Sequence, residues 1–282
     1  MILFDKKSEL TSRINDLKKQ EKSVGFVPTM GALHQGHLSL IEEARNENEI
    51  VVASIFVNPT QFDNQEDLLK YPKTLESDLN LLKESGCDFV FVPTVEEIYS
   101  EQVEAKNFDF GGIEFEMEGK FRSGHFDGVA TIVKELFKIV NPTIAYFGEK
   151  DFQQLQIIKK LVEIEELPIT IKGCPIFREK DGLAMSSRNM RLSDEQRKVA
   201  PFIYNILTKA REKFKAQNIE KISEWVENQF KNHPLLDLEY FLIADENSLK
   251  PSNEKEISKN YRAFIAVYAG KIRLIDNINL SL

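Results

Sequence analysis

Short apolar runs alternate along the first two thirds of the chain with longer segments in which apolar residues recur every three or four positions. Residues 24–27 and 50–56 are continuous apolar runs, typical of strands buried on both faces of a parallel sheet. The same pattern predicts further strands over 89–92, 143–147 and 169–177, and helices over 8–19, 38–48, 75–85, 126–140 and 152–166. Repeated alternation of strand and helix predicts an α/β fold, a doubly wound (Rossmann-like) parallel sheet.

The C-terminal third has a different pattern and lacks glycine-rich polar loops. Four segments there predict regular structure: a long helix that begins at the Ser-x-x-Gln capping box of 193–196 and reaches about residue 216, a helix around Trp225, and strands over 239–243 and 263–268. Strands and helices that are not interleaved predict a second, smaller α+β domain. We place the two domains at 1–176 and 177–282.

Composition and charge narrow the function classes. The 282 residues are 42% hydrophobic with a net charge of −8, which is typical of a globular protein and argues against a broad nucleic-acid surface. Cys87 and Cys174 are far apart and have no metal-ligand spacing, so we expect reduced thiols. The first residues have no apolar signal core, and the run at 50–57 is too short to span a bilayer. We expect a cytoplasmic protein without a membrane partner.

The stretch 28–37, Pro-Thr-Met-Gly-Ala-Leu-His-Gln-Gly-His, lies on a predicted strand-to-helix turn. In a parallel sheet such turns lie at the carboxyl edge, where ligands bind, and a helix start offers unpaired N–H groups to phosphate. His34 and His37 could cap the helix, or they could donate hydrogen bonds to phosphate oxygens. A metal site is disfavoured because no cysteine or carboxylate pair lies nearby in the sequence.

Four further polar segments are candidates for chemistry. Gly148-Glu149-Lys150-Asp151 places a compact cation at a strand end, either solvated or on phosphate. The serines and arginine of 186–188 would form a phosphate clamp, or simply a polar linker. The amides of Asn58 and Gln61 are neutral and offer both donors and acceptors, so they could bind a small polar ligand. The segment 118–129 is either a wall of the site or a structural turn.

These strings resemble one known family. His34-Gln35-Gly36-His37 resembles the HxGH motif of adenylyl-transferring enzymes, and VPTMGALHQGHLSLI resembles the pantoate–β-alanine ligases. The resemblance implies three groups of site residues: catalytic His34, His37 and Lys150; ATP-binding Met30, His34, His37, Gly148, Glu149, Lys150, Asp151, Phe177, Met185, Ser186, Ser187 and Arg188; and pantoate- or β-alanine-binding Met30, Asn58, Gln61 and Gln154. Residues 24–192 carry the specific matches.

The resemblance also implies a reaction. It implies an ATP-dependent carbon–nitrogen ligase that condenses (R)-pantoate with β-alanine through pantoyl adenylate, releasing AMP and pyrophosphate. Mg²⁺ would accompany ATP, bridging its phosphates without an all-protein cage. A homodimer is implied, as is a second domain that acts as a lid and carries the Met-Ser-Ser-Arg loop at its start. The chain departs from the family pattern at Gln35, Lys73, Ser123 and Phe177.

Three other functions are weighed against this one. An adenylyl transferase of the same superfamily, acting on a phosphorylated cofactor precursor, would accumulate a dinucleotide. A nucleotide sensor that retained the fold would bind ATP without pyrophosphate exchange. A tRNA-linked activity is disfavoured by the acidic charge balance and by the lack of a predicted anticodon-binding domain.

Overall fold

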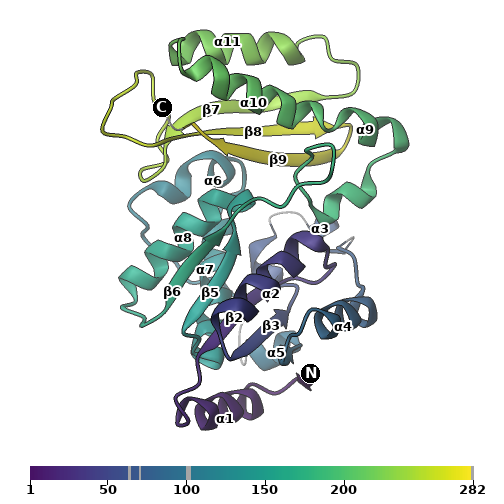
Figure 1. The fold of residues 1–282 in the computed structure, drawn as a ribbon, viewed down its shortest axis with the longest axis vertical. Helices are drawn as coiled ribbons and strands as arrows, with labels where there is room; N and C mark the ends of the chain where they lie inside the picture. The colour runs from purple at the N-terminus through teal and green to yellow at the C-terminus, as the bar shows by residue number, and fades with distance from the viewer. Residues whose placement is uncertain (63–64, 70, 100–102, 281–282) are drawn as a thin grey trace. The chain divides into compact units, whose positions relative to one another are not determined.

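The computed structural model describes residues 1–62, 65–69, 71–99 and 103–280, which divide into two compact units (Figure 1). The first unit comprises Met1–Glu149 and Gln153–Pro175, and the second comprises Lys150–Phe152 and Ile176–Leu282. The first domain predicted from the sequence includes Lys150–Phe152. The structure groups this short piece with the second unit, where the Phe152 ring lies 5.9 Å from the ring of Phe264.

The first unit is built on a six-stranded sheet in the order β1-β4-β3-β2-β5-β6, and every pair is parallel. Its strands are β1 (Ile2–Phe4), β2 (Val24–Thr29), β3 (Ile50–Ile55), β4 (Phe89–Phe91), β5 (Ile144–Gly148) and β6 (Thr170–Cys174). From β2 the chain first winds outward through β3 and β4, and then returns to place β5 on the other side of β2. The predicted doubly wound sheet is confirmed, and its strand order reverses between β2 and β5.

Helices cover both faces of this sheet. The helices that the structure describes in the first unit are α1 (Lys7–Lys18), α2 (Gln35–Glu47), α3 (Gln65–Leu69), α4 (Leu75–Glu84), α5 (Val95–Ile98), α6 (Met117–Phe121), α7 (His125–Val140) and α8 (Phe152–Ile164, of which Phe152 groups with the second unit). They are accompanied by the 3₁₀ turns η1 (Pro59–Gln61), η2 (Ile113–Phe115) and η3 (Glu149–Asp151, of which 150–151 group with the second unit). Val27 packs in a buried cluster with Ile41 of α2, whereas the Phe26 ring lies 6.3 Å from Phe137 of α7. Because adjacent strand residues point to opposite faces, α2 and α7 lie on opposite sides of the sheet.

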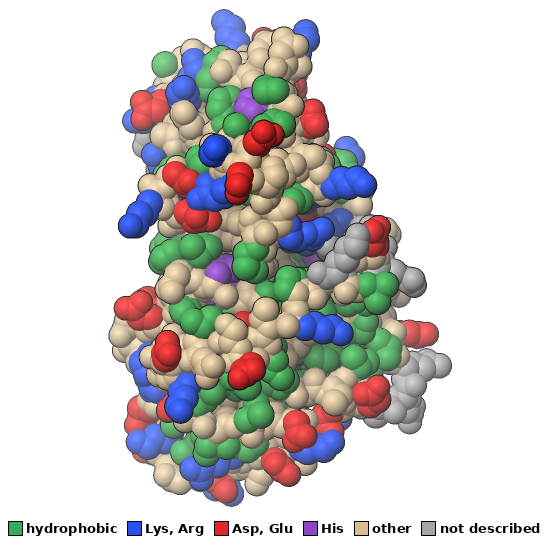
Figure 2. All heavy atoms as spheres, turned by 90° about the vertical axis from the view of Figure 1, so that its right-hand side faces the viewer, with side chains coloured by type: hydrophobic (Ala, Val, Ile, Leu, Met, Phe, Trp, Pro, Cys, Tyr) green, Lys and Arg blue, Asp and Glu red, His purple; other side chains and the backbone are tan. Residues whose placement is uncertain are grey.

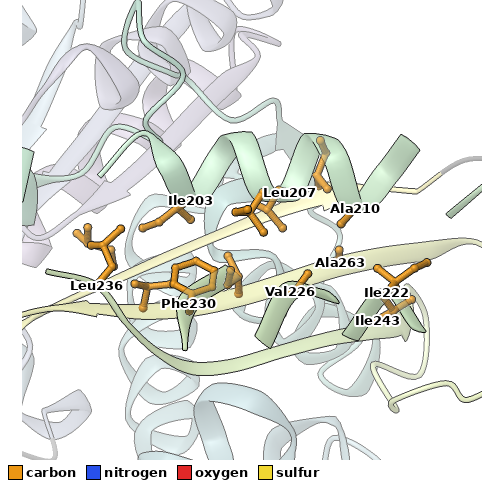
Figure 3. Packing of buried hydrophobic residues seen from close by; sticks show 14 of the residues in the cluster. Ile203, Leu207, Ala210, Ile222, Val226, Phe230, Leu236, Ile243 and Ala263 are labelled. Atoms are coloured by element: carbon orange, nitrogen blue, oxygen red, sulfur yellow. The ribbon is translucent and has the colours of Figure 1, made fainter. Parts of the chain in front are cut away.

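The second unit is an antiparallel sheet, β7-β8-β9, covered on one face by two helices (Figure 1). Its elements are η4 (Ser187–Arg191), α9 (Asp194–Val199), α10 (Phe202–Phe214), α11 (Ile219–Phe230), β7 (Asp237–Asp245), β8 (Tyr261–Ala269) and β9 (Ile272–Asn279). Figure 3 shows the core, in which Leu207 of α10 and Val226 of α11 face Ala263 of β8. The predicted α+β character of this part is confirmed.

Several predicted boundaries are wrong for local reasons. The Ser193 capping box forms as predicted, but the helix that it opens ends at Val199. Pro201 interrupts the predicted long helix, because proline lacks the N–H that a continuous helix would need, and α10 begins directly after it. The strand predicted to reach residue 177 ends at Cys174, directly before Pro175. Two strands, β1 and β9, were not predicted from the sequence. None of the helices in the described part of the chain is long and apolar enough to cross a membrane.

Candidate active site

The turn that follows β2 adopts an unusual backbone conformation. Gly31 has φ +81°, and Ala32 has φ +50°, in the left-handed region that costs energy for a residue with a side chain. A Cβ at Gly31 would lie 3.1 Å from both Asp78 Oδ2 and Ile55 Cγ2. Glycine is therefore favoured here by its backbone conformation, and a side chain would also be tight against Asp78 and Ile55.

Asp78 of α4 holds this turn in place. Its side chain is only 2% exposed, and its carboxylate accepts hydrogen bonds from the backbone N–H groups of Ala32 (2.9 Å) and Leu33 (2.8 Å). The Thr74 hydroxyl donates a third bond at 3.0 Å. Sequence reasoning did not select Asp78. The available signal was an acidic residue three positions after Leu75, on the face of α4 that is otherwise apolar.

His34 and His37 both cap the start of α2. The Nδ1 atom of His34 accepts from the Gly36 N–H at 3.2 Å, and Nδ1 of His37 accepts from the His34 N–H at 3.3 Å. The two rings lie 4.1 Å apart between centroids and are inclined by 35°. An imidazole that accepts at Nδ1 carries its proton on Nε2 in the neutral form. Capping and donation by the same histidine are therefore compatible, since they use different nitrogens.

The Gly148-Glu149 segment leaves the sheet next to this turn. β5 pairs with β2 through Gly25–Ile144 and Phe26–Ala145, in parallel, so both strands end at the same edge. Lys150 and Asp151 follow in η3, where Lys150 Nζ lies 3.6 Å from Asp151 Oδ1. The strand order thus brings the ends of β2 and β5 together at the point where it reverses.

Met30, Asn58 and Gln61 form a cluster after β2 and β3. Gln61 Nε2 lies 3.1 Å from the Met30 sulfur, and Asn58 Nδ2 donates to Gln61 Oε1 at 3.2 Å. Asn58 is 1% exposed; it also donates to the Gly128 carbonyl at 3.1 Å and accepts from the Tyr99 hydroxyl at 2.7 Å. These three residues, all predicted to bind the acid substrate, therefore contact one another in series. Asn58 is the most buried of them and makes further hydrogen bonds to protein groups.

The segment 118–129 supports this cluster through the backbone of Gln61. His125 Nδ1 lies 2.8 Å from the Gln61 carbonyl oxygen, which can only accept, so this nitrogen is the donor. Arg122 lies 3.1 Å from His125 Nε2 and also donates to the Gln61 carbonyl at 3.4 Å. A Cβ on Gly128 would lie 2.4 Å from the Thr60 carbonyl oxygen, so α7 packs directly on η1. The segment thus holds the backbone of the Gln61 turn in place.

The adjacent glutamines of α8 have different environments. Gln153 is 4% exposed, and its amide donates to the Ile113 carbonyl (2.9 Å) and the Glu116 carbonyl (2.7 Å) while accepting from the Glu118 N–H (3.0 Å). Gln154, the residue predicted to bind pantoate, is half-buried. The Gln153 side chain therefore has a structural role, and Gln154 is the glutamine with a partly accessible side chain.

The Met-Ser-Ser-Arg loop belongs to the second unit and has a defined conformation. Ser186 caps η4, accepting the Arg188 N–H at 3.3 Å, and the Asn189 amide donates to the Ala184 carbonyl at 3.1 Å. The Met185 N–H donates to the Phe177 carbonyl at 3.0 Å, which links this predicted ATP-binding residue to the loop. Ser187 and Arg188 begin η4 itself.

The surface charge of the described residues in one view gives no sign of a broad polyanion-binding face (Figure 2), and the two thiols are poor candidates for covalent catalysis. Acidic and basic side chains are interspersed over the face in Figure 2, and the described residues form no continuous basic surface there. Burial raises the pKa of the Cys87 thiol to about 12 and that of Cys174 to about 11, so both are protonated near neutral pH. Protonated, buried thiols are poor nucleophiles.

Comparison with known proteins gives this geometry its context. The family model described as pantoate–β-alanine ligase matches residues 2–279. The chain belongs to the pantoate–β-alanine ligase family. Pantothenate synthetases of Christiangramia forsetii and Flavobacterium psychrophilum are 55% and 52% identical over 282 and 281 residues, covering 100% and 99% of this chain and all of each relative.

Solved structures agree with this assignment. Pantothenate synthetase from Thermus thermophilus superposes with a TM-score of 0.92 at 41% identity, over the full length of both chains. A pantoate–β-alanine ligase from Francisella tularensis, complexed with β,γ-ATP and β-alanine, gives 0.83 at 38% identity, covering 99% of this chain and 98% of that one. As in its family, the activity of this chain is the ATP-dependent joining of pantoate to β-alanine, which yields pantothenate.

Proposed function

We propose that this ligase works in two steps through an enzyme-bound pantoyl adenylate. The pantoate carboxylate attacks the α-phosphorus of ATP; a new P–O bond forms, the bond to the β-phosphate breaks, and pyrophosphate leaves. The β-alanine amine then attacks the acyl carbon, loses a proton, and expels AMP. Neither step needs a covalent bond to the protein, which suits a chain whose cysteines are buried, protonated thiols.

One observation carries the proposal. The His34–His37 turn and the Gly148-Glu149 segment follow neighbouring parallel strands where the strand order reverses. In open α/β sheets, ligands bind at this position. A nucleotide phosphate placed there would meet the N-terminus of α2, whose positive dipole end and N–H groups favour an anion.

The histidines and Lys150 are proposed as the catalytic groups. Because His34 and His37 accept backbone N–H groups at Nδ1, each can donate from Nε2 to an oxygen of the reacting α-phosphate. Donors fixed in advance stabilise the charge that builds in the transition state without reorganising during the reaction. Lys150 would add a compact positive charge to the same phosphates.

Further ATP contacts are proposed in addition to the histidines and Lys150. We propose that Ser186, Ser187 and Arg188 bind phosphate oxygens, using the hydroxyl and guanidinium donors of η4 and its cap. Contacts to the nucleoside and the adjoining phosphates are assigned to Met30, Gly148, Glu149, Asp151, Phe177 and Met185.

Pantoate is proposed to bind at the Met30–Gln61 pair and at Gln154. Neutral amides would hold the hydroxy acid without neutralising its carboxylate, which must remain a nucleophile. Asn58 is assigned a supporting role at this site. Its buried amide already holds Gln61 and Gly128, so it fixes the position of the glutamine that would contact the substrate.

Magnesium, assembly and compartment complete the proposal. Among the described residues, no group of three or more His, Cys, Asp or Glu side chains could hold a metal ion. Mg²⁺ would be carried by ATP phosphate oxygens, where it offsets their negative charge. We also propose a homodimer, which equilibrium sedimentation would test, and a reducing cytoplasm, consistent with two buried cysteines that form no disulfide.

The decisive test measures pyrophosphate exchange and AMP release with ATP and Mg²⁺. Pantoate alone should support exchange of labelled pyrophosphate into ATP, and AMP should accumulate with pantothenate only when β-alanine is added. Formation of a dinucleotide would favour the rival adenylyl transferase. ATP binding with no exchange for any acid would favour the nucleotide sensor.

A further inference from the structure

Two adjacent polar residues are buried in the middle of β9. Asp276 and Asn277 are 4% and 2% exposed, and they lie between Ile275 and Ile278 in the strand. Burying a carboxylate and an amide is costly unless each is hydrogen-bonded or paired. As neighbours in a strand they point to opposite faces of the sheet. The partner of Asn277 is Lys150, to which the proposed function assigns a catalytic role. The partner of Asp276 is Arg178, at the start of the loop that leads to Ser186.

Asn277 holds the backbone of Lys150. Its Nδ2 donates to the Lys150 carbonyl oxygen at 2.9 Å, and its Oδ1 accepts from Arg262 Nη1 at 2.6 Å. The Arg262 guanidinium in turn lies 3.9 Å from the centre of the Phe152 ring. Residues 150 and 152 are therefore fastened to the same face of the β8–β9 pair, one by a hydrogen bond and the other by a cation–π contact.

Asp276 holds the start of the loop that leads to Ser186. Its carboxylate forms a two-pronged ion pair with Arg178, at 2.7 Å to Nη1 and 2.9 Å to Nη2. Arg178 also donates to the Gly182 carbonyl at 3.1 Å and lies 3.8 Å from the centre of the Tyr204 ring. The ion pair thus fixes the turn between residues 178 and 184, directly before the Met-Ser-Ser-Arg sequence.

The two anchors are joined within one strand. The Asn277 N–H donates to Asp276 Oδ1 at 2.7 Å, and Arg178 Nη2 also donates to the Asn277 carbonyl at 3.3 Å. The backbone of the pair is in register with β8, Asp276 opposite Ile265 and Asn277 opposite Phe264. Because β9 is paired with β8, the positions of the Asp276 and Asn277 side chains are fixed relative to each other.

We propose that Asp276 and Asn277 are positioning residues for adenylation. They set the Lys150 backbone and the base of the phosphate-binding loop at a fixed relation, so that both segments act on one ATP. Neither residue touches substrate. The inference rests on the proposed roles of Lys150 and Ser186–Arg188, and it adds that their alignment is built into β9.

The main test replaces Asn277 with Asp and with Ala. Asn277→Asp keeps the size and the acceptor for Arg262 but removes the N–H that holds the Lys150 carbonyl. We expect pyrophosphate exchange at saturating ATP and pantoate to fall by roughly 10- to 100-fold, as for a catalytic group displaced by a fraction of an ångström to an ångström. The second half-reaction, from added pantoyl adenylate and β-alanine, should stay close to wild type.

Asn279→Ala is the matched control. Asn279 lies two residues along the same face of β9 and donates to Glu246 Oε1 at 2.9 Å, an oxygen that also accepts from Arg262. Its replacement therefore disturbs the Arg262 side of the network but keeps the hydrogen bond from Asn277 to Lys150. Exchange should be close to wild type in this variant. Equal loss of both half-reactions in the Asn277 variants, or wild-type exchange, would overturn the proposal. Absence of exchange in the wild-type protein would instead reject the proposed function.

Asp276 is tested through the affinity for ATP. Asp276→Asn and Arg178→Lys both break the two-pronged pair, and Arg178→Lys retains the positive charge if the first variant folds poorly. We expect the KM for ATP to rise in exchange assays while the KM for pantoate is unchanged. An unchanged KM for ATP in a folded variant, judged by its circular-dichroism melting curve, would refute the role of the ion pair.

Discussion

Replacing Asp78 should damage the His34–His37 turn without touching any substrate group. The carboxylate accepts the backbone N–H groups of Ala32 and Leu33, which are 2% and 8% exposed residues with little access to water. Leaving a buried donor without an acceptor costs roughly 1–3 kcal/mol, so Asp78→Ala should lose about 2–6 kcal/mol in the free energy of unfolding. That loss is a large part of the roughly 5–15 kcal/mol available to a domain.

Asp78→Asn is the more informative variant because it should remain folded. Its amide keeps one acceptor oxygen, so one of the two N–H groups loses its partner, and we expect a loss of roughly 1–3 kcal/mol. The freed turn would move the α2 N-terminus, and displacement by about 1 Å can cost on the order of 10²-fold in rate. Urea unfolding followed by circular dichroism measures the first effect, and single-turnover adenylation measures the second.

Asp88→Asn provides the comparison. Asp88 also accepts a backbone N–H, from Val51 at 2.8 Å, and pairs with Arg45, but it lies at the amino edge of the sheet. This variant should lose stability with no specific loss of adenylation. If Asp78→Asn adenylates at the wild-type rate, or if both variants lose activity equally, the reasoning about the turn is refuted.

Three further predictions test the site and its support. His37→Ala should slow single-turnover adenylation by roughly 10²–10³-fold, by analogy with the loss of one oxyanion donor. A near wild-type rate would contradict the role of this histidine. His37→Gln keeps a helix-capping acceptor, so it should unfold at a higher urea concentration than His37→Ala. Gly128→Ala places a Cβ 2.4 Å from the Thr60 carbonyl oxygen, so it should lower the free energy of unfolding by about 1–3 kcal/mol and raise the KM for pantoate; unchanged values of both would contradict the packing argument. Because the pKa of Cys87 is raised to about 12 and that of Cys174 to about 11, both should remain protonated at pH 8 and react with iodoacetamide far more slowly than in urea, whereas equal rates would show that burial does not protect them.

The four inner strands of the parallel sheet, β2 to β5, could be predicted well from the sequence because they are mostly buried. Buried strands of this kind are continuous apolar runs, and the helices between them have apolar residues at every third or fourth position. The kind of each element and the order of the elements could therefore be predicted from short stretches of sequence. β1 was missed because it has only three residues at the edge of the sheet, and two of them are exposed. β9 was missed because Asp276 and Asn277 interrupt its apolar pattern, although the fold buries both.

Within the candidate site, the motif residues could be found from the sequence, whereas the residues behind them could not. Motif strings identify groups that would face a ligand, such as His37 and Gln61. Asp78 and Asn277 are far in sequence from the backbone groups that they hold, 45 or 46 residues in one case and 127 in the other. Contacts of that kind depend on tertiary structure, and a single sequence contains no local pattern that reveals them.

The short piece Lys150–Phe152 has a consequence for protein engineering. Although it lies between β5 and most of α8 in the sequence, it completes the second unit, where Phe152 packs on Phe264 and beneath Arg262. A chimera that took residues 176–282 from a relative would combine a foreign sheet with a native Phe152. Exchanges that carry residues 150–152 together with the C-terminal part should preserve this packing. The unit to transfer between relatives of this ligase therefore consists of two segments that are separate in the sequence.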